Sequence, residues 1–358
     1  MKPKTIAILH FNIIEQYPPV MNFIFDNLEE NPELRILVFT TNNTTNYKTP
    51  TFPNTKIYRF GTISLNPLKR YTSYLWFNLM SSLILLFKNF DLIVAFESLS
   101  IFPLWLRTNI RVKTKAHLHF HEYISLLECQ ISSIYMKILF KLEDQLLRKH
   151  QCSHTNEDRK RIFLKDKPFL KSENVEVRRN MPPKSWWNQY GQLKKPNTDS
   201  KICFVHVGAA DHKTMYIKEV LEWAKENSKK IELTFISHQI DKETKNLILN
   251  INCSSINILN PIDYYELPKE LIKYGIGLVL YKGHIPNYIY NVPNKVYEYL
   301  ACGLQVWYSK DLLTTDKLNI VFNGIENDNK NDILIPSFLK VLHCNDYYSQ
   351  DKIFVNKK

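Results

Sequence analysis

The sequence has little glycine and no regular cysteine pattern. Only 8 of its 358 residues are Gly, so loops that approach a ligand must use Asn, Pro and helix ends instead of glycine-rich turns. Its 6 Cys are scattered without a CxxC pair, which excludes a disulfide framework and is typical of a reducing compartment. The apolar run near the N-terminus spans only about six residues, too few for a signal peptide. We therefore expect a protein of the cytoplasm.

Acidic residues are scarce in the first half of the chain. The formal charge is +12, and residues 1–183 hold 25 Lys or Arg against 16 Asp or Glu, whereas the rest holds 22 against 19. A nucleic-acid partner is not expected, because the sequence lacks a basic helix repeat, an RNP-like strand and zinc-ligand spacing. An anionic bilayer fits better, since each basic residue near such a surface contributes about 1 kcal/mol. We expect peripheral contact with the inner face of the cell membrane.

Long hydrophobic runs and internal repeats are also absent, and short apolar strands alternate with helices. This alternation predicts an α/β protein with parallel sheets covered on both faces. The length exceeds what one core usually fills, which predicts two doubly wound, Rossmann-like units. The predicted strands are residues 5–11, 34–40, 56–60, 92–96, 116–120, 201–207, 233–237, 256–259, 274–281 and 304–307. The predicted helices are residues 20–28, 70–88, 124–149, 215–227 and 242–250.

The composition of the chain indicates where the expected domain boundaries lie. Residues 184–200 are polar, contain Pro and show no periodicity, which predicts a linker. The first domain then spans residues 1–183, and the second spans residues 201–330. Residues 331–358 form a tail, in which residues 333–343 are a helix candidate.

The run from Tyr288 to Trp307 carries the strongest signal. It reads as a loop, a helix and a strand. Pro293 suits the first helical turn, where free amides could face an anion. Glu298 lies one turn beyond Lys295, and Gly303 ends the helix. On spacing alone, an ordinary helix–strand unit with a Gly cap remains an alternative.

Residues 293–304 resemble the PNK(L/V)xEYxAxGLPV signature of GT-B glycosyltransferases in the family-four (group 1) retaining type. Residues 274–281 resemble the strand ADIGLVPY of that family, and residues 264–268 resemble its yeeLp helix start. The resemblance implies two domains that face each other across a cleft. It also implies that Glu298 binds the donor ribose and that the preceding loop wraps the diphosphate. The donor-binding candidates are Gly208, Tyr290, Asn291, Val292, Pro293, Asn294, Lys295 and Glu298.

Two positions depart from the family pattern. Tyr290 stands where the commonest form has a second Glu, near the transferred sugar. Members of the PNK-EY subtype often lack this Glu. Gln305 replaces Pro after Gly-Leu, which affects strand entry more than chemistry.

A histidine-rich strand ends at residues 117–123. Alternation places His117, His119 and His121 on one face, which leaves a metal cluster open as an alternative. The resemblance instead implies that His121 and Glu122 contact the acceptor or the transferred sugar. Glu122 could also cap or charge the first turn of the next helix.

Three further segments resemble the family in chain order. In residues 204–213, Gly208 would admit the donor phosphates, and Lys213 would stabilise the leaving phosphate unless it is solvated surface. Residues 154–159 precede a helix that Asn156 could cap, and residues 179–183 resemble an NxPP strand exit. Asn12, Tyr17 and His119 complete the site as acceptor-binding candidates, beside the catalytic candidates His121, Glu122 and Lys213.

The segment from Pro67 to Lys88 begins with cations and continues with aromatic and aliphatic residues. Its apolar stretch falls short of the roughly 20 residues that a membrane span needs. An interfacial helix that carries Trp76 and Phe77 would suit a lipid-linked acceptor. A buried helix that covers the sheet is the alternative.

Together these features predict a retaining glycosyltransferase that moves a sugar from a UDP- or GDP-linked donor to a glycan or lipid-linked glycan. The resemblance places it in surface polysaccharide assembly, such as lipopolysaccharide or capsule. No DxD-type pair ends a strand, so we expect no metal and no cofactor, with the nucleotide sugar as a substrate. A silent GT-B scaffold that binds glycan, or a sugar-nucleotide epimerase, remains an alternative.

Overall fold

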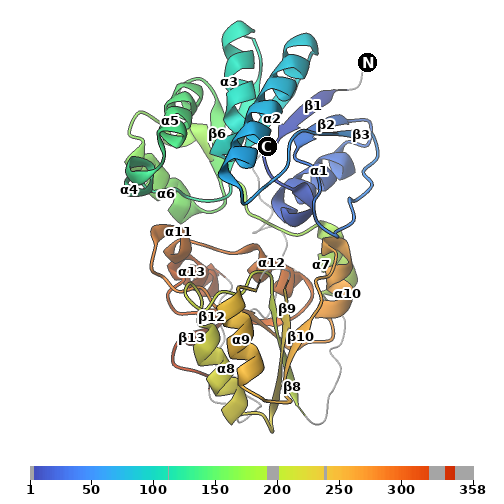
Figure 1. The fold of residues 1–358 in the computed structure, drawn as a ribbon, viewed down its shortest axis with the longest axis vertical. Coiled ribbons are helices and arrows are strands. Elements are labelled where there is room, and N and C mark those ends of the chain that lie inside the picture. Colours follow the sequence, from blue (N-terminus) through green and yellow to red (C-terminus); the bar gives the residue numbers. More distant parts are fainter. Residues whose placement is uncertain (1–3, 112, 192–200, 238–239, 322–334, 343–358) are drawn as a thin grey trace. The chain divides into compact units, whose positions relative to one another are not determined.

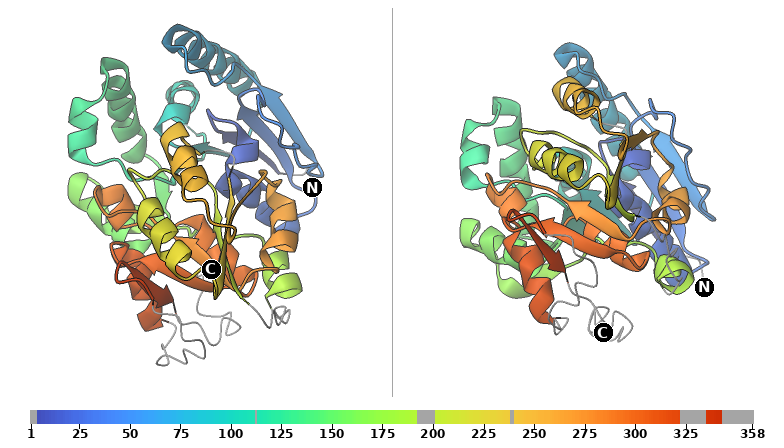
Figure 2. Two further views of the ribbon diagram at one scale, coloured as in Figure 1. Left: turned by 60° about the horizontal axis from the view of Figure 1, so that its bottom comes forward. Right: turned by 90° about the horizontal axis from the view of Figure 1, so that it is seen from below.

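The chain folds into two compact units, residues 1–183 and 184–358. The computed structural model describes residues 4–111, 113–191, 201–237, 240–321 and 335–342. Each unit has a mainly parallel sheet with helices packed on it (Figures 1 and 2). The prediction of two doubly wound, Rossmann-like units is confirmed.

The first unit has a seven-stranded sheet in the order β3-β2-β1-β4-β5-β6-β7, and all neighbouring strands are parallel. Its strands are β1 (Thr5–Leu9), β2 (Arg35–Thr40), β3 (Thr55–Arg59), β4 (Leu92–Phe96), β5 (Ala116–Phe120), β6 (Gln151–His154) and β7 (Val175–Val177). Its α-helices are α1 (Pro18–Glu30), α2 (Pro67–Phe87), α3 (Ile101–Ile110), α4 (Leu126–Ile131), α5 (Ile134–Leu147) and α6 (Glu157–Asp166).

Helices cover both faces of this sheet because its strands are apolar on both sides. In β4, Ile93 and Ala95 belong to the core that α2, α3, α5 and α6 share. The next residue, Phe96, points to the other face and meets Phe23 of α1 at 5.5 Å between ring centroids. Alternation along one strand thus joins two layers of helices to one sheet.

The second unit has a six-stranded sheet in the order β10-β9-β8-β11-β12-β13, in which only β13 is antiparallel to its neighbour. Its strands are β8 (Ile202–Val207), β9 (Ile231–Ile236), β10 (Ile256–Leu259), β11 (Ile276–Val279), β12 (Gln305–Ser309) and β13 (Leu339–Leu342). Its α-helices are α7 (Lys184–Tyr190), α8 (Ile217–Glu226), α9 (Lys242–Asn250), α10 (Leu267–Leu271), α11 (Pro286–Ile289), α12 (Asn294–Ala301) and α13 (Leu313–Val321).

Three local predictions are wrong. The expected linker begins as helix α7, because Trp186 and Trp187 are buried and Trp186 packs on the Tyr264 ring at 4.9 Å. Within the expected helix over residues 333–343, residues 339–342 instead form strand β13, since Leu339 and Val341 alternate into the core. The expected helix over residues 124–149 breaks at Ser132 and Ser133 into α4 and α5. Residues 192–200, 331–334 and 343–358 lie outside the described residues.

The sequence prediction also missed elements. These include α3 and β6 in the first unit and α11 and α13 in the second. Each sheet reverses its strand order at one point, between β1 and β4 in the first unit and between β8 and β11 in the second. Ligands of doubly wound folds bind at the carboxyl ends of the strands at such points.

Candidate functional site

In the second unit, three elements meet at the carboxyl ends of β8 and β11. Gly208 follows β8, Tyr281 follows β11, and Lys295 stands in the first turn of α12. The Lys295 Nζ lies 5.0 Å from the centre of the Tyr281 ring and 3.7 Å from where a Cβ on Gly208 would lie. The strand order therefore brings a cation to the point where a ligand is expected.

Lys295 is buried although its ammonium group has three hydrogens to donate. Its side chain is only 8% exposed, and Nζ has no hydrogen-bond partner within the described part of the chain. Burial lowers the pKa of Lys295 from 10.5 to about 8, and Glu298 opposes part of that shift. A buried cation without an acceptor is unfavourable unless an anion joins it, so this position suits a negatively charged ligand.

Glu298 lies one turn along α12 from Lys295. It is 6% exposed, and the Tyr264 hydroxyl donates a hydrogen bond to its carboxylate. Burial raises the pKa of Glu298 to about 7, while Lys295 and the Tyr264 hydroxyl pull it down. The predicted placement of Lys295 and Glu298 three residues apart on one helix is confirmed.

The loop before α12 presents the rest of the predicted phosphate-binding segment. Pro293 is the N-cap of α12, with ψ 148°, and no side chain of the described residues caps this end of the helix. The prediction that Pro293 lies inside the first turn is therefore wrong by one residue. Tyr290 is the C-cap of α11, and the Asn291 carbonyl accepts a hydrogen bond from the Thr315 hydroxyl at 2.9 Å. Val292 and Asn294 complete this continuous segment.

Gly208 is required by its backbone. Its φ is +94°, a conformation that residues with a Cβ rarely adopt, and its amide donates to the Ile236 carbonyl at 2.9 Å. The positive φ therefore favours glycine here, whereas a Cβ would meet the Lys295 Nζ only at ordinary contact distance. The Tyr299 hydroxyl accepts from the Val207 amide at 2.9 Å and fastens α12 to the same strand end.

Lys213 lies in the loop after β8 and is exposed. It pairs with Glu243 of α9 at 3.1 Å, and this hydrogen bond and charge raise the pKa of Lys213. That position agrees with the alternative of a solvated surface residue, and its catalytic role stays a prediction.

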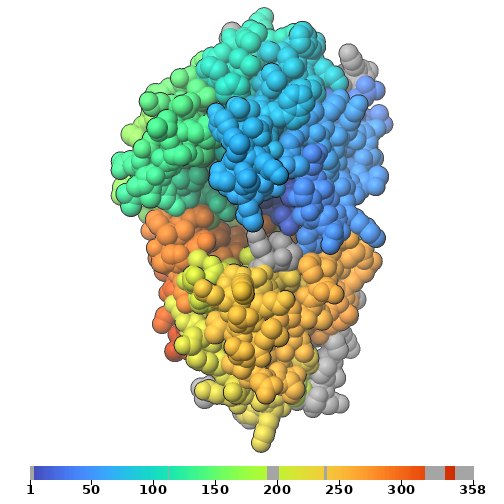
Figure 3. Space-filling view, viewed as in Figure 1, coloured from blue at the N-terminus to red at the C-terminus, as the bar shows by residue number. Residues whose placement is uncertain are grey.

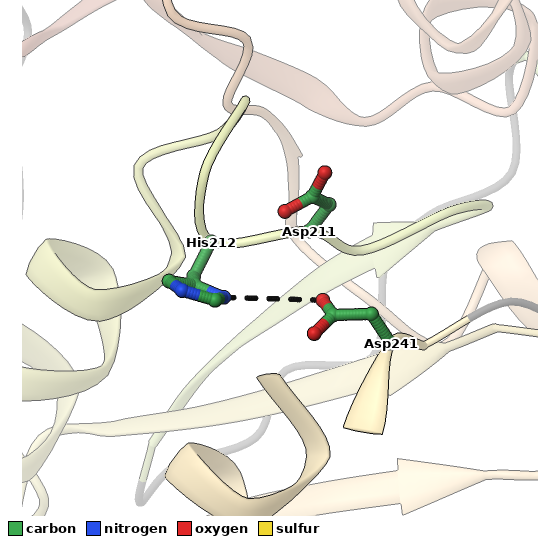
Figure 4. Close-up of side chains that lie close together, drawn as sticks. All are labelled: Asp211, His212 and Asp241. Atoms are coloured by element: carbon green, nitrogen blue, oxygen red, sulfur yellow. Dashed lines mark ion pairs between the residues drawn. The ribbon is translucent and has the colours of Figure 1, made fainter. Parts of the chain in front are cut away.

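One trio in the described part of the chain has ligand atoms close enough to hold a metal ion: Asp211, His212 and Asp241 (Figure 4). Asp241 caps α9 by accepting from the Glu243 and Thr244 amides at 3.0 Å. Nδ1 of His212 lies 2.9 Å from the Thr244 hydroxyl, and the Asp211 carboxylate accepts from the Lys213 amide. Local caps and turns account for this trio without a metal.

In the first unit, a half-buried carboxyl group lies at the point where β1 and β4 diverge. Glu97 follows β4 with φ 62°, a left-handed conformation that is uncommon for a residue with a side chain. Its Oε1 accepts from the Tyr17 hydroxyl at 3.0 Å, the His121 amide at 2.6 Å and the Glu122 amide at 3.3 Å. Burial and the nearby Glu122 raise the pKa of Glu97 to about 8. Strained residues of this kind cluster at functional sites.

Two neutral histidines flank this carboxyl group. The Tyr17 ring lies 4.3 Å from the His10 ring and 5.2 Å from the His121 ring, measured between centroids. Burial lowers the pKa of both histidines to about 3. Both His10 ring nitrogens and Nδ1 of His121 lack a hydrogen-bond partner among the described residues. The cluster thus offers several polar groups suited to sugar hydroxyls.

The sequence reasoning found part of this cluster. It named Tyr17, His121 and Glu122 but missed His10 and Glu97. The usable signal for Glu97 is a carboxylate directly after the apolar run of β4.

Other predicted acceptor residues lie differently. His119 is 3% exposed, and its Nδ1 lies 2.8 Å from the Ser153 hydroxyl, which His117 also contacts at 2.7 Å. The histidines therefore share a serine within the described sheet instead of forming a metal cluster. Asn12 is exposed, and its side chain accepts from the Ile13 amide.

Two capping alternatives have clear outcomes. Ser125 caps α4 in a capping box with Glu128, so the alternative that Glu122 caps or charges the first turn of that helix is wrong. Asn156 caps α6 as predicted, by accepting from the Arg159 amide at 2.9 Å. Arg159 is buried and donates to the His121 carbonyl, which fixes the loop that carries His121 and Glu122.

Solved structures share this fold. The chain matches a UDP-forming α,α-trehalose-phosphate synthase from Burkholderia vietnamiensis with a TM-score of 0.61 and 12% identity, over 89% of this chain and 86% of that one. It matches a sucrose-phosphate synthase from Thermosynechococcus elongatus with a TM-score of 0.59 and 12% identity, over 87% and 83%. A third match is the lipopolysaccharide outer core galactosyltransferase WaaB, with a TM-score of 0.52 and 10% identity, over 84% and 79%.

The chain has the GT-B fold. No family model matches the sequence, and neither does any curated protein. At these identities the structural likeness shows the fold alone.

Proposed function

We propose that this chain is a glycosyltransferase that moves a sugar from a nucleotide-diphosphate sugar to a glycan acceptor. The main support is the buried Lys295 ammonium, which has no hydrogen-bond acceptor among the described residues and lies beside Gly208 where β8 and β11 diverge. A diphosphate would supply the missing negative charge. The PNK resemblance and the GT-B fold, shared with a UDP-forming synthase, support the same ligand.

The donor roles follow from chemistry. Lys295 and the uncapped first turn of α12 would bind the diphosphate and stabilise the charge that grows on it as the sugar leaves. Glu298 would hold the ribose hydroxyls. Because a cation and helix amides can meet this charge, we propose metal-independent transfer.

We assign binding of the acceptor to the first unit. The carboxyl group of Glu97, with a pKa near 8, can donate a hydrogen bond to a sugar hydroxyl or accept one. Tyr17 and His121 add contacts beside it, and His121 stays neutral at physiological pH. Retention of configuration and an acceptor in lipopolysaccharide or capsule assembly remain proposals from the resemblance and from the likeness to WaaB.

A panel of UDP- and GDP-linked sugars tests this proposal, with mass spectrometry of donor and product. We expect one donor to be consumed, and Glu298→Gln to reduce its turnover at least about tenfold. Lys218→Met, an exposed residue of α8, is the matched surface control.

The two rivals predict different results. A silent scaffold, which Tyr290 in place of the second Glu favours, would bind neither UDP nor GDP. An epimerase would convert the donor into an isomer without any acceptor. Either result would overturn the proposed transfer.

A further inference from the structure

Exposed apolar residues are concentrated in one part of the first unit. Of nineteen exposed large apolar side chains among the described residues, sixteen lie between residues 63 and 138, and only three lie in the second unit. Nine of the sixteen belong to α2 and the loop before it. Exposed apolar patches of this extent usually mark an interaction surface.

Helix α2 is apolar on its exposed side and mixed on its buried side. The side that faces the protein includes Asn78, Ser81 and Ser82, all buried. The exposed side carries what we call the α2 stripe, spaced at three or four residues: Leu68, Tyr71, Leu75, Trp76, Leu79 and Leu83. Figure 3 shows α2, in light blue, at the surface of the first unit. Tyr74, Phe77 and Leu85 are buried in the core, which accounts for the packing of α2 on the sheet. This packing does not account for the α2 stripe.

This outcome also revises the sequence prediction. Phe77 is fully buried, so it cannot serve an interfacial face, whereas Trp76 is 51% exposed. The alternative of a buried helix that covers the sheet is confirmed for one side of α2, and the interfacial role stays a prediction for the other side.

A second apolar stripe adjoins the first. Tyr135 of α5 contacts Tyr71 and Tyr74 of α2 at 6.1 and 4.9 Å between ring centroids. On either side of Tyr135, Ile134 and Ile138 are 79% and 52% exposed. The two stripes thus form one surface on neighbouring helices.

The segment of the sequence that contains α2 has charges of one sign. Residues 34–90 contain no Asp or Glu. They contain seven cations: Arg35, Lys48, Lys56, Arg59, Lys69, Arg70 and Lys88.

Two of these cations lie where they do not stabilise helix α2. Lys69 and Arg70 lie in the first turns of α2, at the positive end of the helix dipole. Asn66 already caps this end by accepting from the Leu68 and Lys69 amides. The cations are therefore better explained by an anion outside the protein.

We propose that the α2 stripe and the start of α5 dock on an anionic bilayer surface. Leucines and Trp76 would enter the headgroup boundary, while Lys69, Arg70 and Lys88 meet phosphate groups at both ends of α2. None of the helices within the described residues is long and apolar enough to cross a membrane. The proposal deepens the proposed function by naming the membrane that would hold a lipid-linked acceptor.

Vesicle co-sedimentation of the full chain tests the proposal. We expect binding to phosphatidylcholine vesicles that contain about one quarter phosphatidylglycerol, and weak binding to phosphatidylcholine alone. Raising salt from about 0.1 M to about 1 M shortens the Debye length from about 10 to about 3 Å and should weaken binding. Leu79→Glu should reduce binding at least about tenfold, whereas Leu249→Glu, exposed in the second unit, should not.

A second readout follows Trp76 directly. Brominated lipids should quench wild-type fluorescence, and Trp76→Phe should lose much of that quenching while it still sediments with vesicles. Circular dichroism and the mass in solution of each variant accompany these measurements.

Several outcomes would overturn the proposal. They are an unbound wild type, Leu79→Glu bound like the wild type, or a dimer that Leu79→Glu dissociates without any vesicle binding. Because vesicle binding needs no nucleotide sugar, its failure can be told apart from failure of the proposed transfer.

Discussion

Replacing Lys295 by Met should make the free protein more stable and the nucleotide site weaker. Burial lowers the pKa of Lys295 from 10.5 to about 8, which corresponds to about 3 kcal/mol of unfavourable free energy in the folded state at pH 7. Met fills similar volume without the charge. We therefore expect Lys295→Met to raise the free energy of unfolding at pH 7 by up to about 3 kcal/mol.

The sign of the pH dependence follows from linkage. Between pH 8 and 10.5 the unfolded chain holds more protons at Lys295 than the folded one, so wild-type stability rises with pH in this window. The advantage of Lys295→Met should therefore shrink from pH 8 upward and vanish near pH 10.5. Urea unfolding of both proteins across this pH range measures the difference in their free energies of unfolding, with Lys218→Met as the exposed control.

Binding should move in the opposite direction. A hydrogen bond to a charged group contributes about 1.5–3 kcal/mol, so Lys295→Met should weaken UDP or GDP binding about 10- to 150-fold. At pH 8 the wild type should take up protons as the diphosphate restores the ammonium charge. Titration calorimetry in buffers of different ionisation enthalpy would detect this uptake. The reasoning would be refuted if Lys295→Met were less stable than the wild type at pH 7. It would also be refuted if Lys295→Met bound UDP and GDP as tightly as the wild type does.

Three further changes test the site and its support. Glu97→Gln should remove a transition near pH 8 from the pH–turnover profile, since the raised pKa of Glu97 causes it; an unchanged profile would contradict this. Gly208→Ala should lower the free energy of unfolding by about 1–2 kcal/mol, because φ is +94°, whereas Gly275→Ala should change it little in the same urea titration. Gly277→Ala should cost about 3 kcal/mol by thermal unfolding, because its Cβ would lie 2.2 Å from the Tyr299 ring; a smaller loss would mean that the ring can move.

Much of the donor side could be predicted from local sequence. Lys295 and Glu298 are three residues apart, and helical geometry alone places them on one face. Gly303 ends α12 with φ +72°, as its position predicted. Such features depend on spacing within one element, which a sequence displays directly.

The acceptor side depended on tertiary structure. Glu97 becomes a candidate only because β4 lies beside β1, which brings Tyr17 to its carboxylate from eighty residues away in sequence. The unusual backbone of Glu97 is not visible in a pattern of apolar residues. The same holds for His10, which is buried and whose ring nitrogens have no hydrogen-bond partner among the described residues.

Two further elements, α7 and β13, form because of tertiary packing, and the local sequence predicted a different structure for each. Residues 184–190 look like a polar linker, but Trp186 and Trp187 fold them into a helix against the second unit. Strand β13 is only four residues long, too short for its alternation to outweigh a helical pattern.

A crystal structure of the chain with UDP or GDP tests the central claim most directly. The account predicts the diphosphate at the first turn of α12, with one phosphate oxygen within hydrogen-bond distance of the Lys295 Nζ and the ribose at Glu298. A nucleotide bound elsewhere, with the Lys295 ammonium still buried and without an acceptor, would contradict it.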